Sequence, residues 1–276
     1  MTSVRVGLIQ MDAQDNPAAN REKAVSLIGQ AVDRGAQLVA LPEVFVYVHA
    51  FNRMQEMAEP INGPTAEVLC ETARRYGIYL VGGSFLERVP GQEKVFNTNL
   101  FIGPDGEIRA IYRKIHLFEL IAPGEVIAIE SQVVEHGKDI VTAETPFGVI
   151  GLTICYDLRF PELYRALADR GARILTVPAA FAMKTGKDHW EVLLRARAIE
   201  NQAYVLAPNQ FGIKPDGSVC YGHSLIVDPW GTVVARASDT EAVITADLDG
   251  GYLEKVRQML PALKNRRVGR EESGRV

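Results

Sequence analysis

The sequence is poor in cysteine. It has 3 cysteines in 276 residues, Cys70, Cys155 and Cys220, and none of them shares the CxxC spacing of a zinc site. An odd and sparse set of this kind also excludes a disulfide framework. We therefore expect reduced thiols and a cytoplasmic protein, in which a single cysteine is a candidate reactive group.

The sequence also lacks long apolar runs and an excess of basic charge. Its longest apolar runs are about as long as a strand, as at 149–155, whereas a membrane helix needs roughly 18 apolar residues. Residues 1–15 carry no basic patch ahead of an apolar core, so we expect no secretory signal. The 30 basic and 34 acidic residues give a formal net charge of −4, which disfavours a nucleic-acid binder.

What the sequence does contain is typical of a globular α/β protein. Its hydrophobic fraction of 47% excludes a disordered chain. Almost continuously apolar runs, typical of strands buried on both faces, alternate with helical patterns, which predicts α/β layers. The expected strands are 4–11, 37–41, 78–85, 98–102, 149–155, 173–177, 203–207, 224–227 and 242–246; the expected helices are 19–34, 64–76, 161–170 and 189–201.

Two parts of the chain resemble each other. VGLIQM at 6–11 resembles IGLTIC at 150–155, and DRGA occurs at both 33–36 and 169–172, each time ahead of an apolar run, a proline and a phenylalanine. Chance similarity between two βαβ units is the alternative. As a repeat, the pattern predicts one α/β domain over 1–263, a four-layer α-β-β-α sandwich built from two related half-sheets. Residues 264–276 are predicted as a polar tail, either frayed or an inter-subunit arm.

Cys155 is the most informative of the three cysteines. It ends an apolar run, and Pro161 marks the expected start of a helix. A strand-to-helix turn exposes a side chain and offers backbone N–H groups to an oxyanion. The alternative is a buried and inert thiol, because free cysteine is among the most buried residue types.

Two charged residues also follow or lie within apolar runs. Glu43 comes directly after the run 38–41 and Pro42, and in the repeat it matches Ala179. A carboxylate there must lie at the sheet edge or be paired, unless it is a solvated or helix-capping glutamate. Lys114, in YRKIHL at 112–117, is by itself typical of a surface strand.

Taken together, three segments resemble the signature segments of the nitrilase superfamily of carbon–nitrogen hydrolases. They are LPE at 41–43, YRKIHL at 112–117 and CYDLRFPE at 155–162, and the resemblance extends through YGHS at 221–224 to PWG at 229–231. It implies an α-β-β-α sandwich, in agreement with the repeat. It also implies a homodimer or a higher homo-oligomer that pairs through an outer helical face.

The resemblance assigns a role to each of the three residues. Cys155 would be the nucleophile, Glu43 the general base that deprotonates it, and Lys114 the stabilising cation. Negative charge on the carbonyl oxygen would face Lys114 and the backbone N–H of Tyr156.

The family's second glutamate would be Glu130, with Glu125 and Glu135 nearby in the sequence. This chemistry requires no metal and no organic cofactor, and the histidines show no close spacing that suggests a metal site. We expect a small-molecule amide as the ligand, with no nucleic acid and no membrane as a partner.

Two further residues are candidates for substrate binding. Arg159 stands four residues after Cys155, and its planar guanidinium is suited to hold a substrate carboxylate. The alternative is a structural salt bridge with Glu162 or Asp157. Thr185 lies in the segment 184–190, predicted as a loop that reaches the pocket and donates a hydroxyl.

The surroundings of the cysteine favour an amide substrate. Tyr156 and Asp157 stand where nitrile-hydrolysing members commonly have tryptophan and glutamate. The segments 157–162, 189–198 and 221–224 resemble the deaminated-glutathione amidase and ω-amidase branches, which implies hydrolysis of a small carboxylated amide to acid and ammonia through a thioester. The alternatives are an N-carbamoyl amino acid amidohydrolase, then a nitrilase, then an inactive binding module. Neither CGSCW nor QACRG, typical of Cys–His proteases, surrounds Cys155.

Overall fold

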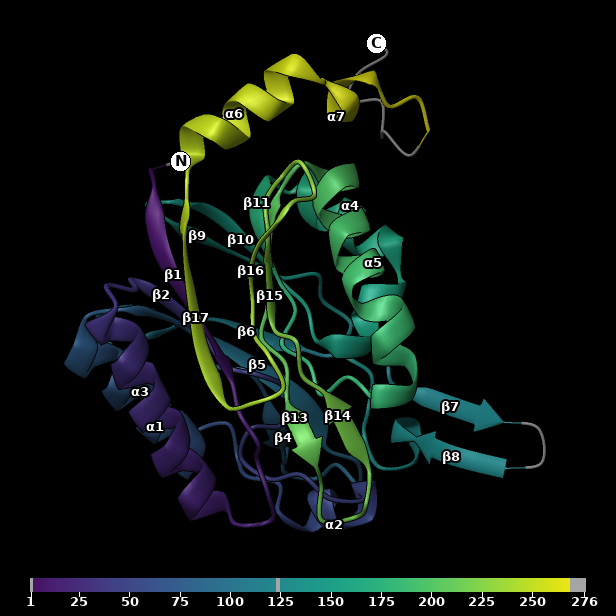
Figure 1. Ribbon diagram of the computed structural model, residues 1–276. Helices are drawn as coiled ribbons and strands as arrows, with labels where there is room; N and C mark the ends of the chain where they lie inside the picture. The colour runs from purple at the N-terminus through teal and green to yellow at the C-terminus, as the bar shows by residue number, and fades with distance from the viewer. Residues whose placement is uncertain (1, 123–124, 269–276) are drawn as a thin grey trace.

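The molecule consists of two β-sheets packed face to face, with helices on both outer sides (Figure 1). The computed structural model describes residues 2–122 and 125–268. Helices α1 (Pro17–Asp33) and α3 (Pro64–Tyr76) cover one sheet, and α4 (Pro161–Asp169) and α5 (Met183–Asn201) cover the other. The predicted α-β-β-α sandwich is therefore confirmed.

The first sheet has 7 strands and the second has 6. The first runs in the order β17 (Ala242–Leu248), β1 (Val4–Gln10), β2 (Leu38–Ala40), β3 (Tyr79–Val81), β5 (Phe96–Ile102), β4 (Phe85–Glu87), and β6 (Ile108–Arg113) also pairs with β5. The second runs in the order β16 (Val233–Arg236), β15 (Leu225–Val227), β12 (Tyr204–Ala207), β11 (Ala172–Thr176), β10 (Gly148–Leu152), β9 (Thr142–Thr145).

The two sheets repeat one pairing scheme. In the first, β1, β2 and β3 are parallel and are flanked by the antiparallel strands β17 and β5. In the second, β10, β11 and β12 are parallel and are flanked by the antiparallel strands β9 and β15. The sequence repeat thus corresponds to two related half-sheets, since its matched segments form β1 and β10.

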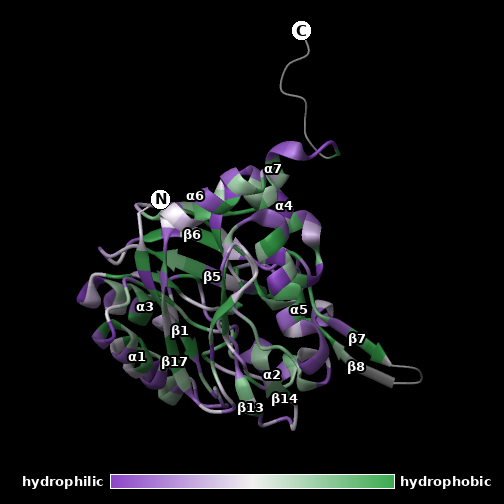
Figure 2. Cartoon of the chain, turned by 45° about the horizontal axis from the view of Figure 1, so that its top comes forward, coloured by the Kyte–Doolittle hydropathy of each residue, from purple (hydrophilic) through white to green (hydrophobic). Residues whose placement is uncertain are grey.

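The strands are almost continuously apolar because both of their faces are buried. Along β1, Val6 and Leu8 face the second sheet, whereas Ile9 faces the helices of the first. Figure 2 shows the consequence, with apolar residues on the strands and mixed apolar and polar residues on helices such as α1 and α4. No helix among the described residues is both long enough and apolar enough to span a membrane.

Shorter elements complete the fold. The hairpin of β7 (Glu119–Ala122) and β8 (Glu125–Ile129) projects from the body of the molecule in Figure 1. The remaining elements are α2 (Phe51–Glu56), the 3₁₀ helices η1 (Glu130–Gln132) and η2 (Cys155–Arg159), the strands β13 (Phe211–Ile213) and β14 (Val219–Tyr221), and the helices α6 (Gly250–Met259) and α7 (Ala262–Asn265).

Two predicted elements differ from the structure, and each contains a glycine in close contact with another part of the chain. The expected strand 78–85 is split into β3 and β4, because Gly83 has a φ of +65° and a Cβ there would lie 2.2 Å from the carbonyl oxygen of Pro42. The expected loop 184–190 is the beginning of α5. Gly186 of that helix packs so closely on Tyr221 that a Cβ would lie 2.4 Å from the ring.

The predicted tail is only partly described. Residues 264 and 265 belong to α7, and Arg266 forms an ion pair with Asp169 beside α4. Residues 269–276 lie outside the described residues. The proposal that this segment is an inter-subunit arm stays a prediction.

Candidate active site

One cavity of about 300 Å³ brings the predicted site residues together. Cys155, Glu43, Lys114 and Glu130 line it, as does Asn97 of β5. Much of the remaining wall is apolar and includes Phe51, Met54, Leu86, Phe118 and Phe181. Charged groups thus meet in a cavity with a largely apolar wall, where their interactions are stronger than in bulk water.

Cys155 lies at the predicted turn between strand and helix. β10 ends at Leu152, Cys155 begins the 3₁₀ helix η2, and α4 begins at Pro161. Cys155 has a φ of +45°, a conformation that is uncommon for a residue with a side chain, and its N–H donates to the Pro178 carbonyl at 2.8 Å. The N–H of Tyr156 belongs to the first turn of η2, where N–H groups have no acceptor within the helix.

Glu43 is buried and joins the two halves of the sandwich. It lies just after β2, yet its Oε2 accepts the Ala180 N–H at 2.8 Å, and Ala180 follows β11 of the other sheet. The next residue, Val44, has a φ of +45° and donates its N–H to Ser84 Oγ at 3.0 Å. A positive φ is a true outlier for a β-branched residue, and such strain gathers at functional sites.

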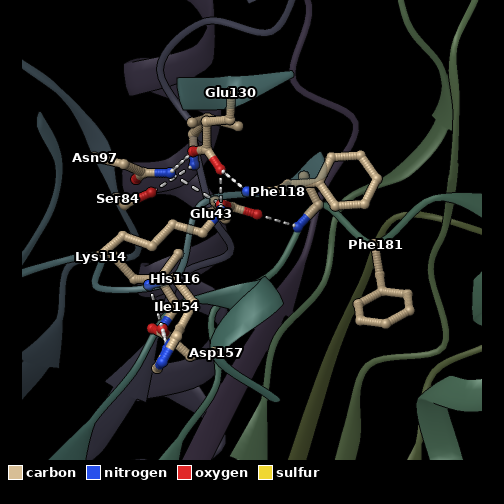
Figure 3. A network of polar contacts seen from close by, with 12 residues as sticks. Glu43, Ser84, Asn97, Lys114, His116, Phe118, Glu130, Ile154, Asp157 and Phe181 are labelled. Atoms are coloured by element: carbon tan, nitrogen blue, oxygen red, sulfur yellow. Dashed lines mark hydrogen bonds and ion pairs between the residues drawn. The ribbon is translucent and has the colours of Figure 1, made fainter. Parts of the chain in front are cut away.

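Lys114 is not a surface lysine. Its side chain is 2% exposed, and its Nζ lies 2.8 Å from Glu43 Oε1 and 2.8 Å from Glu130 Oε2 (Figure 3). Burial alone would lower the pKa of this ammonium, but the charges of Glu130 and Glu43 hold that pKa well above its usual value. Lys114 therefore stays protonated between two carboxylates, with a third donor hydrogen left for another acceptor.

Glu130 is the second glutamate of the site. Its Oε2 also accepts the Phe118 N–H at 2.6 Å, which fixes the carboxylate beside Lys114. Glu135, the neighbour considered from the sequence, instead accepts the N–H of His136. The side chain of Glu125 lies outside the described residues.

The surroundings of Cys155 keep its thiol protonated. Burial, followed by the negative charge of Glu43, raises the pKa of the Cys155 thiol well above its usual value, although Lys114 opposes this rise. A hydrogen bond with the Glu43 side chain acts in the same direction as burial. A neutral thiol in contact with a carboxylate is an arrangement in which the carboxylate can remove the proton during attack.

Arg159 lines the cavity and has no ion pair with a carboxylate in the part of the chain that the structure describes. Its guanidinium lies over the rings of Tyr156 and Phe181, and its NH1 lies 3.2 Å from His189 Nδ1. Neither Glu162 nor Asp157 forms the alternative salt bridge with Arg159 among the described residues. Asp157 instead accepts hydrogen bonds from the Tyr112 hydroxyl and from the backbone N–H groups of His116 and Ile154.

Thr185 also lines the cavity, although in a helix rather than a loop. It lies in the first turn of α5, whose N-cap residue Ala182 caps no N–H with its side chain. Free N–H groups and the helix dipole make this end of α5 favourable for negative charge.

The sequence analysis missed Asn97. Its side chain is 1% exposed, and its Nδ2 donates to Glu43 Oε1 at 2.9 Å and to Glu130 Oε1 at 3.1 Å (Figure 3). The available signal was an asparagine in a run that reads as a buried strand, where an amide needs partners. The strand predicted over 98–102 begins at Phe96 in the structure, so Asn97 belongs to it.

An ammonium and an amide bridge the two carboxylates. Among residues 2–122 and 125–268, no group of three or more histidine, cysteine, aspartate or glutamate side chains could hold a metal ion. Donors already occupy the positions between Glu43 and Glu130.

Comparisons with known proteins agree with this geometry. The carbon-nitrogen hydrolase family model matches residues 5–258. The chain is 41% identical over 267 residues to the omega-amidase NIT2 of Danio rerio, with 97% of this chain and 96% of that protein covered.

Solved structures give the same result. The NitFhit protein of C. elegans superposes with a TM-score of 0.91 at 38% identity, over 97% of this chain and 66% of that chain. A mutant amidase from Nesterenkonia sp. AN1, with acrylamide added at its active-site cysteine, superposes with a TM-score of 0.79 at 28% identity, over 95% and 99%. These matches confirm the resemblance found in the sequence, and the chain belongs to the carbon-nitrogen hydrolase family.

Proposed function

We propose that the protein is a cysteine-dependent amidase that hydrolyses a small carboxylated amide to an acid and ammonia. The observation that carries the proposal is the Cys155 thiol, held on a strained turn, hydrogen-bonded to Glu43 and within the electrostatic influence of Lys114, inside one cavity. The name of the Danio rerio relative, an omega-amidase, and the modified cysteine of the Nesterenkonia amidase support the same chemistry.

The first half of the reaction forms a thioester. Glu43 takes the proton from the Cys155 thiol as the sulfur attacks the amide carbon. The carbonyl oxygen becomes negative and faces the third donor hydrogen of Lys114 and the N–H of Tyr156. Glu43 then passes its proton to the amide nitrogen, the C–N bond breaks, and ammonia leaves.

The second half regenerates the enzyme. Glu43 removes a proton from water, the resulting hydroxide attacks the thioester carbon, and the same two donors stabilise the oxyanion. The C–S bond breaks, the acid departs, and the proton returns from Glu43 to the sulfur. Glu130 holds Lys114 and Asn97 in place throughout.

The substrate carboxylate binds at Arg159 in this proposal. Arg159 is a cation that lines the cavity and has no carboxylate partner among the described residues. Its contact with two aromatic rings orients the guanidinium, and Thr185 and the N-terminal end of α5 lie on the same wall. A cavity of about 300 Å³ suits a small substrate.

Hydrolysis of an N-carbamoyl amino acid is the second candidate. It would use the same nucleophile, base and cation, and such a substrate also carries a carboxylate. Nitrile hydrolysis follows as a less favoured candidate, because Tyr156 and Asp157 replace the tryptophan and glutamate common after the cysteine in nitrile-hydrolysing members.

The test is ammonia release from ω-amides, N-carbamoyl amino acids and nitriles, with each carboxylated substrate paired with an uncharged analogue. In Arg159→Lys we expect kcat/KM for the carboxylated amide to fall about ten- to a hundredfold, because lysine cannot form the two parallel hydrogen bonds of a guanidinium. The uncharged analogue should change much less. Equal losses would show that Arg159 does not bind the carboxylate. If none of the substrates releases ammonia, the remaining interpretation is an inactive binding module.

We also propose that the protein acts in the cytoplasm as a homodimer or higher homo-oligomer. The three cysteines are free, which agrees with a reducing compartment. On the outer helical layer, Val192 and Ile199 of α5 are 66% and 47% exposed, and Trp230 is also exposed. Sedimentation analysis of Val192→Glu beside the unmodified protein tests pairing through this face, and an unchanged assembly would contradict it.

A further inference from the structure

Asn97 and Lys114 are the two side chains among the described residues that bond both carboxylates of the site. They approach the same oxygen of Glu43, because Lys114 Nζ lies 2.8 Å and Asn97 Nδ2 lies 2.9 Å from Oε1. Figure 3 shows the Asn97 amide directed at the two glutamates. A neutral amide therefore completes a ring of four groups, and Glu43 of this ring forms a hydrogen bond with the Cys155 thiol.

The orientation of the Asn97 amide follows from its partners. Ionised carboxylates only accept hydrogen bonds, so the amide must turn its NH₂ group toward them. Its Oδ1 is then left buried without a partner in the described part of the chain. The protein tolerates this unsatisfied oxygen, which is costly, in exchange for two hydrogen bonds to charged acceptors.

The two oxygens of Glu43 consequently differ. Oε1 accepts two hydrogen bonds, from Lys114 and Asn97, which occupy both of its lone pairs. Oε2 accepts one, from the Ala180 N–H, and keeps one lone pair free. The charged or titratable groups that interact with Glu43 are Lys114, which follows β6, Glu130 of η1, Cys155 of η2 and Cys220 of β14.

We propose that Asn97 is a positioning residue that directs proton transfer to Oε2 of Glu43. With Oε1 saturated, the proton leaving Cys155 Sγ forms its new bond to Oε2, and the electron pair of the S–H bond stays on sulfur for attack. The hydrogen bond that Asn97 donates is stronger to a charged carboxylate oxygen than to a neutral carboxyl oxygen. This inference rests on the proposed role of Glu43 as the base.

The chain offers a closely matched control. Asn99 lies two residues further along β5, so its side chain is on the same face of the sheet, and it is also fully buried. Neither amide atom of Asn99 has a hydrogen-bond partner in the described part of the chain. Asn97→Leu and Asn99→Leu are therefore the same substitution at two buried positions on the same face of the same strand. Only Asn97→Leu removes the hydrogen bonds to Glu43 and Glu130.

The first readout is alkylation of Cys155 by iodoacetamide as a function of pH, followed by mass spectrometry. The rate falls in acid as the base becomes protonated. In Asn97→Leu we expect this acid limb to move up by about one pH unit, because a lost hydrogen bond makes the carboxylate easier to protonate. In Asn99→Leu the limb should stay in place. A merely structural role would not move it.

The second readout is ammonia release. We expect kcat of Asn97→Leu to fall about a hundredfold with KM changed little, the scale of a misplaced catalytic group. Asn97→Asp, which has the same shape but donates at most one hydrogen, is the second variant if Asn97→Leu does not fold, and it should move the acid limb in the same direction. Melting temperatures establish that each variant is folded.

The two readouts separate this inference from the proposed function. If the unmodified protein releases no ammonia but the alkylation profile still moves in Asn97→Leu, the substrate proposal fails and the positioning role stands. If ammonia is released and the profiles of Asn97→Leu and Asn99→Leu coincide with the original, the positioning role is overturned.

Discussion

Replacing Lys114 by methionine should remove both activity and stability, because two buried carboxylates lose the cation between them. Lys114 Nζ lies 2.8 Å from each of Glu43 and Glu130, and all three side chains are at most 6% exposed. Breaking a buried ion pair by removing one partner costs about 3–5 kcal/mol of the free energy of unfolding. Loss of an oxyanion donor should lower kcat by at least about a hundredfold.

The loss of stability in Lys114→Met should depend on pH in a defined direction. Without the ammonium, the neighbouring carboxylates repel, and the folded variant takes up a proton more readily than the unfolded chain does. A folded state that binds the extra proton is favoured in acid and disfavoured as the pH rises. The deficit in unfolding free energy should therefore grow between about pH 5 and about pH 8, by at most about 1.4 kcal/mol for each pH unit and proton.

The assay is urea unfolding followed by tryptophan fluorescence at both pH values, together with ammonia release. Arg113→Met, in the preceding residue at the end of β6, is the control, because Arg113 pairs with the buried Glu87 at 2.6 Å and neither residue lines the cavity. This control should lose stability and keep its kcat. An unchanged kcat in Lys114→Met, or a stability deficit equal at both pH values, would refute the reasoning.

Three further outcomes follow from the same geometry. Cys155→Ala should keep its fold but release no ammonia. Mass spectrometry of the unmodified protein with substrate should show an acyl adduct that the variant lacks. Full activity in the variant would exclude the thiol as nucleophile. Because burial and the charge of Glu43 raise the pKa of Cys155, the difference in thiolate absorbance between these two proteins should be near zero at neutral pH, and a clear thiolate band would contradict the neutral-thiol mechanism. EDTA should leave ammonia release unchanged, since Lys114 and Asn97 bridge the carboxylates; inhibition that zinc reverses would overturn this.

The sequence alone was sufficient for features that depend on local pattern. Apolar runs of strand length between helical patterns predicted the layers, and the repeated DRGA segments predicted two related half-sheets. The turn at Cys155 was also predictable, because Cys155 ends an apolar run and Pro161 marks the start of a helix. Periodicity and chain breaks are short-range properties that a sequence shows directly.

The tertiary structure decided how distant groups meet. Glu43 and Ala180 are 137 positions apart in the chain and hydrogen-bond only because the two sheets pack face to face. In sequence, Lys114 looks like a surface lysine. Its burial depends on two carboxylates from other segments, Glu43 after β2 and Glu130 of η1. Asn97 could not be assigned a role from its neighbours in sequence, since its partners Glu43 and Glu130 come from other segments. Long-range pairing of this kind follows from packing, which local pattern does not encode.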